Sequence, residues 1–422
     1  MESEPHIRTP LRILLPLGAS TALALTGDAS LYTVLPTHTE EAGILLAGVG
    51  VILGINRGIR IISNSLAGAA YDRFSRRRLY VPSLFLGSIS TVLYALTTGL
   101  WPLLLARMLW GIAWSGIWVG GMSVVMDVTT SRNRGRWLGF YQTWFFLGIA
   151  QGSFLGGLLT DLAGYTIAMY AGAALTALGA FGALLFLPET RRPSRREDTS
   201  WLAGPAGAAS NPARPARPRV VRSGGSGLWV GSLLLGVNRF VLAGILSATI
   251  SLLVADSIGA IGGFAGTSTI TGVVIAGRTL LSMASAPLIG GLSDVLSNRR
   301  IIILSLLATG CAGMLLIALG RPAFILGGIT VAAFAFGGLP VMARSVTGAD
   351  VPVGSAAPSA GNPRTGRRIG LLHTVGDVGS AAGPPFAYLI LSWTGLSGLF
   401  LLASAFFAAV FLLLVRPRAA TD

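Results

Sequence analysis

Long apolar segments alternate with short polar turns along almost the whole chain of 422 residues. A membrane-spanning helix needs about 20 consecutive, largely apolar residues. A window of this length finds twelve such segments, at residues 12–36, 42–66, 79–99, 101–126, 137–160, 166–187, 228–254, 264–289, 301–320, 323–346, 369–392 and 396–415. The pattern therefore predicts an all-α membrane protein with twelve transmembrane helices.

One long polar stretch, residues 188–227, divides these segments into two sets of six. It is rich in Pro, Gly, Ala, Ser and Arg and has no helical periodicity, which is the composition of a flexible tether. We expect residues 1–187 and 228–422 to form two six-helix bundles, joined by this basic cytoplasmic linker. A second polar stretch, residues 347–368, has the composition of a long loop.

The two halves repeat each other. Gly68-Ala-Ala-Tyr-Asp72 and the arginines after it recur as Gly290-Gly-Leu-Ser-Asp294, followed by Arg299 and Arg300. A glycine series also recurs, and it comprises Gly139, Gly148, Gly152, Gly156 and Gly157 in the fifth segment and Gly370, Gly379, Gly383 and Pro384 in the eleventh. Such small residues let helices pack closely, and we expect the same of Gly68. Duplication of a six-helix unit predicts two pseudo-symmetric bundles with a binding site between them.

Composition and charge agree with a membrane protein. The chain is 52% hydrophobic and 11% charged, whereas soluble proteins are about 25% charged. The net charge of +15 comes from arginines in alternate turns, which predicts cytoplasmic termini in the cell (inner) membrane rather than nucleic-acid binding. The single cysteine and the three scattered histidines predict neither a metal site nor a cofactor. A membrane enzyme is disfavoured because no nucleophile with a base, and no metal cluster, is evident.

The basic turn at residues 68–78 carries a family resemblance. With six plus six segments and a central basic linker, the chain resembles the major facilitator superfamily of secondary transporters. The turn resembles the signature that gates the cytoplasmic side in that family. The resemblance gives gating roles to Gly68, Asp72, Arg73, Arg76 and Arg77, to the acidic partner Asp127, and to the second copy at Gly290 and Asp294.

Two further motifs resemble those of proton-coupled members. Arg107 with Gly111 resembles the motif of the fourth segment, and the glycine series resembles that of drug/proton antiporters. Ser153 stands where that family has proline, although Pro384 keeps it in the second copy. The resemblance therefore implies proton-coupled efflux, while none of these motifs names a substrate.

Seven ionisable residues fall inside the apolar segments: Asp28, Arg57, Arg60, Arg107, Arg239, Arg278 and Asp377. A charge in the middle of a membrane costs about 2.5–3.5 kcal/mol on insertion scales, so these residues should face a cavity or each other. Five are positive and two are negative. The excess favours an anionic or electron-rich substrate, unless some of these arginines reach the membrane surface or serve the structure.

Each acidic residue has two interpretations. Asp28, with Tyr32 one turn further on the same face, is either a proton-binding carboxylate or a permanent partner of an arginine in the second segment. His373 and Asp377 share a face of the eleventh segment, where they form either a proton relay or a structural contact. We place Asp28, Arg107, Asp377 and His373 in proton coupling.

The arginines also have two interpretations. Arg57 and Arg60 lie on one face of the second segment, and Arg278 falls near the repeat position of Arg57. They form either an anion clamp, or an Arg57–Asp28 pair with Arg60 at the cytoplasmic rim. Arg239 either contributes to the cavity or pairs with Asp377. The tryptophan stripe at Trp110, Trp114 and Trp118 lines either the cavity or the lipid, and the predicted substrate site is Arg57, Arg60, Arg239, Arg278, Tyr32, Trp114 and Gln142.

The sequence thus predicts a monomeric secondary transporter in the lipid bilayer. Its partners are protons and a small organic or amphipathic solute, which it exports by alternating access. One alternative is a carrier of an organic or phosphorylated anion held by Arg57 and Arg278. The others are a lipid flippase and a non-transporting membrane sensor.

Overall fold

The computed structural model of the chain describes residues 10–130, 133–191, 225–259, 265–296, 298–347 and 363–415. These residues contain eleven helices that are long and apolar enough to cross a membrane. The last of them holds two spans, because the backbone leaves the helical conformation at Gly395, where φ is 65°. The twelve predicted spans are therefore all present.

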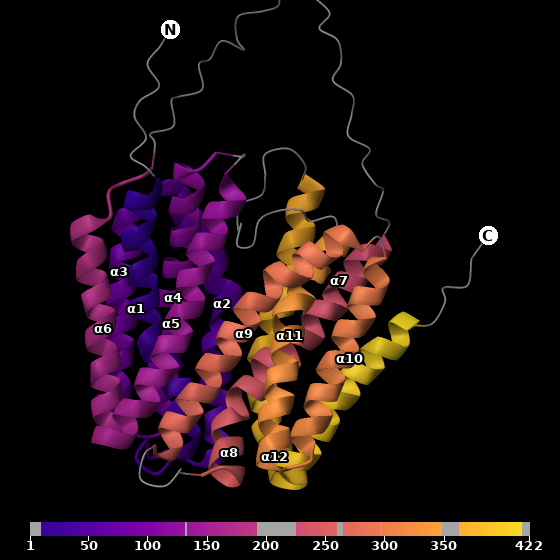
Figure 1. Cartoon of the computed structure of the whole chain (residues 1–422). Helices are drawn as coiled ribbons and strands as arrows, with labels where there is room; N and C mark the ends of the chain where they lie inside the picture. The colour runs from indigo at the N-terminus through magenta and orange to yellow at the C-terminus, as the bar shows by residue number, and fades with distance from the viewer. Residues whose placement is uncertain are drawn as a thin grey trace, which may run out of the picture.

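The first six spans form one bundle (Figure 1). In this N-terminal bundle α1 packs on α5 and α6, α3 packs on α4 and α6, and α2 packs on α4. Gly164, with φ of 88°, makes the tight turn between α5 and α6. The helices are α1 (Pro10–Val34), α2 (Leu46–Arg73), α3 (Arg76–Leu96), α4 (Leu100–Val128), α5 (Arg134–Ala163) and α6 (Tyr165–Phe186), with a short 3-10 turn, η1 (Leu35–Thr37), after α1.

The last six spans form the C-terminal bundle. Its helices are α7 (Gly225–Val237), η3 (Asn238–Leu246), α8 (Ser247–Ser257), α9 (Thr267–Val295), α10 (Arg299–Ala318), α11 (Pro322–Thr347) and α12 (Pro363–Val415). The segments α7, η3 and α8 run on as a single span, of which η3 is π-helical. Because π-helical turns are rare and occur frequently at functional sites, η3 marks this span as a candidate part of the site.

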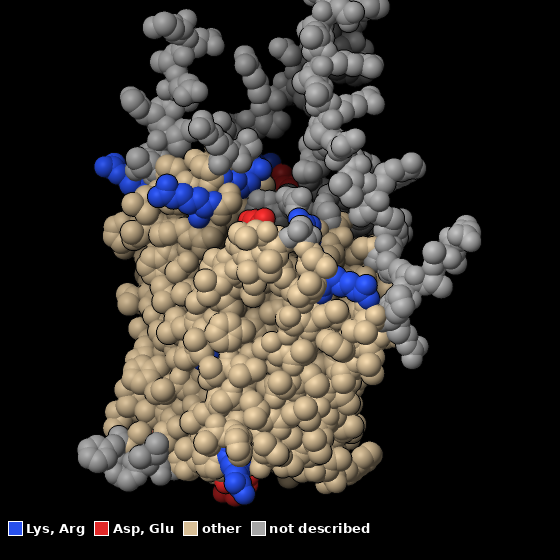
Figure 2. Space-filling model, turned by 45° about the vertical axis from the view of Figure 1, so that its right-hand side comes forward, with Lys and Arg blue, Asp and Glu red and all other residues tan. Residues whose placement is uncertain are grey.

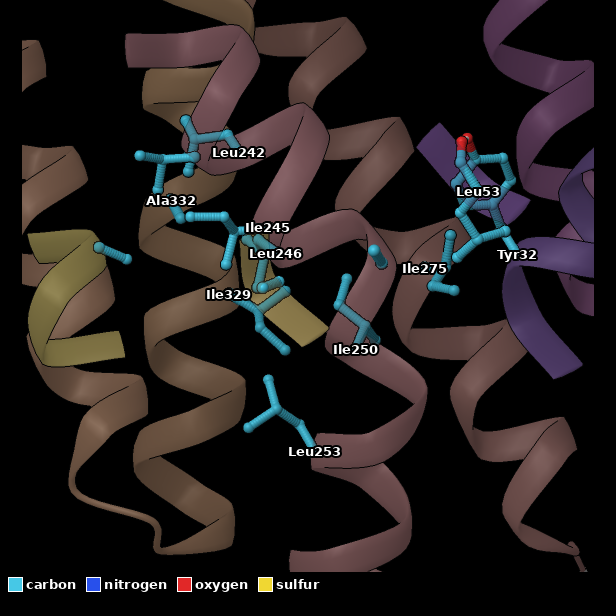
Figure 3. Close-up of a cluster of buried hydrophobic side chains, with 14 of the residues drawn as sticks. Tyr32, Leu53, Leu242, Ile245, Leu246, Ile250, Leu253, Ile275, Ile329 and Ala332 are labelled. Carbon is cyan, nitrogen blue, oxygen red and sulfur yellow. The ribbon is translucent and has the colours of Figure 1, made fainter. Parts of the chain in front are cut away.

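Two clusters of buried side chains form the core. The larger one joins aliphatic side chains of η3, α8 and α11 to residues of the N-terminal bundle, and Figure 3 shows Leu246 and Ile250 in it. The smaller one lies within the N-terminal bundle and includes Trp110 and Trp114, which are 1% and 5% exposed. Both alternatives for the tryptophan stripe are therefore wrong for these two residues, since they face neither a cavity nor lipid.

The bundles meet at the end opposite to the chain termini. There α5 contacts α9, and the first half of α12 contacts α2. A Cβ atom added at Gly54 would lie 2.6 Å from the carbonyl oxygen of Ala381, and one added at Gly157 would overlap the carbonyl oxygen of Ser268. The glycines nearest the termini, such as Gly68, Gly139 and Gly290, would meet no atom within 4 Å.

The close-packing role predicted for Gly68 and Gly139 is therefore wrong in this conformation. In the rest of the series, Gly148, Gly152 and Gly156 pack on α1, and Gly379 and Gly383 pack on α7 and η3. The backbone of Pro384 packs against Gly50 of α2, where an added Cβ atom would lie 2.8 Å from the carbonyl oxygen of Pro384. The surroundings of Gly370 lie outside the described part of the protein.

Candidate functional site

A buried ion pair joins α1 and α4. Asp28 Oδ1 lies 2.5 Å from Nη1 of Arg107, whose side chain is fully buried. The same guanidinium donates to the hydroxyl of Tyr94 and to the carbonyl of Ile52, while Asn56 donates to Asp28 across 3.4 Å. The predicted partner of Asp28 on α2 is therefore wrong: α4 supplies the arginine, and α2 supplies only an amide.

Tyr32 connects this ion pair to the bundle interface. The guanidinium carbons of Arg57 and Arg107 each lie 5.3 Å from the centre of its ring, within the range of a cation–π contact. Its hydroxyl donates to the carbonyl of Leu53. Figure 3 shows Tyr32 and Leu53 beside Ile275 of the other bundle. A change in charge at Asp28 is therefore only two side chains away from the interface.

Arg57 of α2 and Arg278 of α9 both reach the backbone of η3. Arg57 Nη1 donates to the carbonyl of Ala243 over 2.6 Å, and Arg278 Nη1 donates to the adjacent carbonyl of Leu242 over 3.4 Å. Arg278 also donates to Ser247 and is only 8% exposed. The predicted Arg57–Asp28 pair is therefore wrong. The two arginines do come together, but protein oxygens take up several of their donors.

Asp377 of α12 faces α2 across the interface. Its Oδ1 lies 3.6 Å from Nη2 of Arg60, and its Oδ2 accepts from the amide of Asn64 over 3.4 Å. Arg60 thus pairs with Asp377 instead of lying unpaired at the rim. The ion pair predicted between Arg239 and Asp377 is absent from the described residues, although Asp377 lies within electrostatic range of Arg239. The side chain of His373 lies outside the described part of the protein, so the proton relay stays a prediction.

The remaining predicted substrate residues lie in the N-terminal bundle. Trp114 stacks between Trp110 and Trp118 at centroid distances of 6.4 and 5.8 Å, and it also contacts Phe145 of α5. Gln142 is half-buried on α5, one turn before that phenylalanine. Trp114 therefore packs inside the N-terminal bundle, and a substrate contact with Gln142 stays a prediction.

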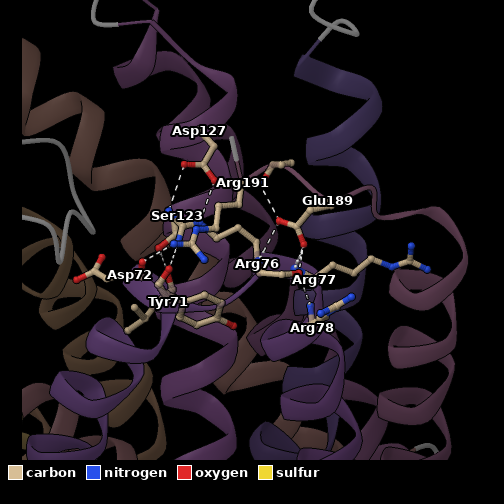
Figure 4. Close-up of polar contacts among 12 residues, drawn as sticks. Tyr71, Asp72, Arg76, Arg77, Arg78, Ser123, Asp127, Glu189 and Arg191 are labelled. Atoms are coloured by element: carbon tan, nitrogen blue, oxygen red, sulfur yellow. Dashed lines mark hydrogen bonds and ion pairs between the residues drawn. The ribbon is translucent and has the colours of Figure 1, made fainter. Parts of the chain in front are cut away.

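The basic turn between α2 and α3 is held by Asp127, as predicted (Figure 4). Arg76 Nε donates to Asp127 Oδ2 over 2.9 Å, while Arg77 donates to the carbonyl of Leu184. Asp72 and Arg73 are exposed, and in the described ranges the carboxylate of Asp72 has no partner. Asp294 is exposed as well. The signature aspartate is thus free to contact a helix of the other bundle if the two approach at this end.

Three residues of this network are missing from the sequence-based prediction. Glu189 accepts from the hydroxyl of Ser75 and from the backbone N–H of Arg76 and Arg77, and so caps the start of α3. Thr190 and Arg191 bind Asp127 and the backbone of the α2 end. Their location just after the sixth span, in Pro188-Glu-Thr-Arg191, was the available signal. Residues 188–191 therefore dock on the first bundle instead of belonging to a free linker.

The cap gives the turn a pH dependence. Burial opposes ionisation of Glu189, but the hydrogen bonds from Ser75 and three backbone amides outweigh it, so its pKa lies below the ordinary value of 4.5. A lowered folded-state pKa adds stability above the ordinary value, and this stability is lost as the pH falls through the folded pKa. We expect Glu189→Gln to lower the unfolding midpoint at neutral pH. In acid, the midpoints of the variant and the wild type should become equal. Thermal unfolding measured against pH checks this, with the exposed Glu40→Gln as the matched control; equal midpoints of wild type and Glu189→Gln at neutral pH would contradict it.

A second carboxylate cap closes the opposite end. Asp161, the third residue from the end of α5, accepts from the backbone N–H of Thr269 over 2.7 Å, from its hydroxyl over 2.6 Å and from the N–H of Ser268 over 3.3 Å. It thus occupies the positive N-terminus of α9, which belongs to the other bundle. This contact can form only while the bundles are together at this end.

Two pseudo-symmetric six-helix bundles with ionised side chains between them define a multi-pass membrane transport protein. The family model described as Major Facilitator Superfamily matches residues 17–259 and 228–422, and the chain belongs to this family. It is 30% identical over 177 residues to the tetracycline resistance protein, class H, of Pasteurella multocida, which covers 41% of this chain and 43% of the relative. The chain thus matches less than half the length of this relative.

Two other comparisons extend over more of the chain. It is 25% identical over 291 residues to the multidrug resistance protein MdtG of Escherichia coli, and the match covers 67% of each. The fold resembles that of a bacterial homolog of the human lysosomal transporter Spinster in an inward-facing, occupied conformation. The TM-score is 0.74, with 16% identity and coverage of 98% of this chain and 97% of the other. That likeness shows the fold alone.

Proposed function

We propose that this protein is a secondary transporter that moves a small organic solute out of the cell in exchange for protons. The observation that carries the proposal is the Asp28–Arg107 pair, a carboxylate held against a fully buried guanidinium. An unpaired buried charge is strongly unfavourable. Proton uptake at Asp28 therefore leaves Arg107 without its partner and favours a rearrangement of its surroundings.

Tyr32 gives that rearrangement a route to the interface. Its ring lies between Arg107 and Arg57, and Arg57 bonds η3 and α12 of the other bundle. When Arg107 shifts, Tyr32 and Arg57 shift with it, and the bonds between α2 and the C-terminal bundle weaken. Proton binding in one bundle is thereby linked to the contact between the two.

The conformation fits one half of a transport cycle. We place both termini in the cytoplasm of the cell, because arginines concentrate at that end; Figure 2 shows them around the upper end of one face, above a largely uncharged band. The closed contacts at Asp161, Gly157 and Gly54 then lie on the outer side. We infer that this conformation is the inward-open state and that the protein works as a monomer.

Transport of tetracyclines or other drugs is the first activity to test. The names of the relatives supply the starting panel of solutes, and proteoliposomes loaded with a pH-sensitive dye supply the assay. A solute pulse that drives a proton flux supports the proposal. Solute movement that is unaffected by a proton gradient would reject it.

A second candidate is a carrier of organic or phosphorylated anions. It is favoured by the excess of arginine at the interface, where Arg57, Arg60 and Arg239 accompany a single described carboxylate, Asp377. In this account Arg57 and Arg278 clamp the anion, and the double change to lysine abolishes transport because the bidentate geometry is lost. Full activity of the double variant would reject this clamp.

A further inference from the structure

Two arginines at the interface differ from the other three buried in the spans. Arg57, Arg107 and Arg278 all donate hydrogen bonds to oxygens of the protein. Arg60 has only the 3.6 Å approach to Asp377, which is longer than a hydrogen bond, and its Nε is buried without a partner. Arg239 is half-buried, and within the described ranges no hydrogen bond or ion pair reaches its guanidinium. Arg107 and Arg278 each have one buried nitrogen without a partner as well, but among these five arginines only Arg60 and Arg239 donate no side-chain hydrogen bond within the described ranges.

The charges around these two side chains do not balance. Arg239 lies within electrostatic range of Arg57, Arg60 and Arg344, and Asp377 is the one carboxylate in that group of described residues. Buried charges are normally paired. One internal carboxylate cannot compensate several guanidinium groups, so the site lacks negative charge.

Geometry places the unused donors in one location. Arg60 belongs to α2, and Arg239 belongs to η3. The Cβ and Cγ atoms of Arg239 pack on α12: a Cβ atom added at Gly376 or Gly379 would lie 3.4 Å from one of them. These glycines neighbour Asp377 on α12, so Arg239 and Arg60 both approach the same turn of that helix. The site is therefore built by both bundles, and a ligand bound there would contact both.

We propose that the transported solute carries a carboxylate, sulfonate or phosphate group, and that this group binds between Arg60 and Arg239 beside Asp377. The inference rests on the proposed transport function and specifies the charge of the solute. Each guanidinium offers a planar fork that matches such an anion. Asp377 acts as the internal anion of the empty site, and the solute competes with it for Arg60. A cationic solute would meet repulsion from every neighbouring arginine.

Binding can be measured without a proton gradient. The full chain is purified into nanodiscs of neutral lipid, and its unfolding midpoint is titrated at constant ionic strength with benzoate, benzenesulfonate and phenylphosphonate. Benzylamine serves as the matched cation. We expect at least one of the three anions to raise the midpoint and benzylamine to leave it unchanged. Stabilisation by benzylamine alone, or by none of the anions, overturns the proposal.

Variants locate the site. Losing charge-assisted hydrogen bonds should weaken anion binding about ten- to a hundredfold in Arg239→Gln and Arg60→Gln, while the exposed Arg321→Gln should bind as the wild type. Arg239→Lys keeps the positive charge but loses the planar guanidinium. Its anion affinity should therefore lie between those of the wild type and Arg239→Gln, and it controls for a folding defect of the glutamine variant. Asp377→Asn should tighten binding, because the competing carboxylate is gone. Unchanged anion binding in both glutamine variants, or its loss in Asp377→Asn, overturns the assignment.

This test is independent of proton coupling. Anion binding without any solute-driven proton flux would reject the proposed exchange mechanism and leave the site standing. Proton flux driven by a cationic solute, with no anion binding, would reject the site and leave the mechanism standing.

Discussion

Replacing Asp28 by Asn is expected to abolish proton-driven transport while solute exchange across the membrane continues. Asparagine has nearly the same size and keeps an oxygen that can accept from Arg107 Nη1, now 2.5 Å from Asp28 Oδ1. Asparagine cannot take up a proton and carries no charge. The variant therefore mimics the protonated state permanently, with no carboxylate to neutralise Arg107. A hydrogen bond to a charged group contributes about 1.5–3 kcal/mol. The hydrogen bond from Arg107 to the asparagine oxygen should therefore keep the protein folded.

The measurement compares two assays on the same proteoliposomes. Solute-dependent proton flux should vanish in Asp28→Asn, whereas counterflow of labelled solute should stay within about tenfold of the wild type. Asp256→Asn, at an exposed position near the end of α8, is the matched control and should behave as the wild type in both. Equal proton flux in wild type and Asp28→Asn would remove Asp28 from the coupling mechanism.

Replacing Gly157 by Ala is expected to prevent closure of the outer side. The added Cβ atom would overlap the carbonyl oxygen of Ser268, which is backbone of the other bundle and cannot rotate away. Overpacking costs about 1–3 kcal/mol, and an equilibrium changes about 5- to 150-fold for that difference. The inward-open population and the transport rate should fall accordingly.

Gly139 provides the control for this substitution. It lies on the same helix and in the same repeated series, but an added Cβ atom would meet nothing within 4 Å. Gly139→Ala should therefore transport as the wild type. Initial rates of solute counterflow compare the two variants directly. A Gly157→Ala protein with the wild-type rate would show that this contact is not needed for closure.

The arrangement of spans follows from the sequence because hydrocarbon accepts only apolar helices with internally bonded backbones. For the same reason the basic turn at residues 68–78 and its neighbour Asp127 were predictable. Charged side chains at the end of a span must lie at the membrane surface, where they meet the other charged span ends. The single interruption of the long last helix falls at Gly395, between the eleventh and twelfth predicted segments.

The pairing of the interior charges did not follow from the sequence. Asp28 could reach an arginine of α2 or of α4. The rotation and packing of the helices determine that its partner is Arg107 of α4. The π-helical turn that receives Arg57 and Arg278 has no pattern of its own in the sequence, because the surrounding packing imposes it. Glu189 was missed because it lies past the sixth span in a polar stretch, where composition says nothing of docking.

The glycine series shows the same limit. Spacing groups Gly152, Gly156 and Gly157 together, yet the first two pack on α1 of their own bundle, and Gly157 alone meets α9 of the other. Side-chain periodicity tells which residues share a face. It does not tell which helix that face will meet.

Distances between spin labels on the two bundles test alternating access most directly. One pair replaces the exposed Leu45 and Trp393 at the outer ends of α2 and of the first half of α12, and the other replaces the exposed Phe74 and Val295 at the inner ends of α2 and α9, in a Cys311→Ser background. The wild type should show a short outer and a long inner distance. On acidification or addition of solute, a second population should appear in which the outer distance is longer and the inner one shorter, and Asp28→Asn should lose its pH response. A single unchanging distance for both pairs, whatever the pH or solute, would contradict the account.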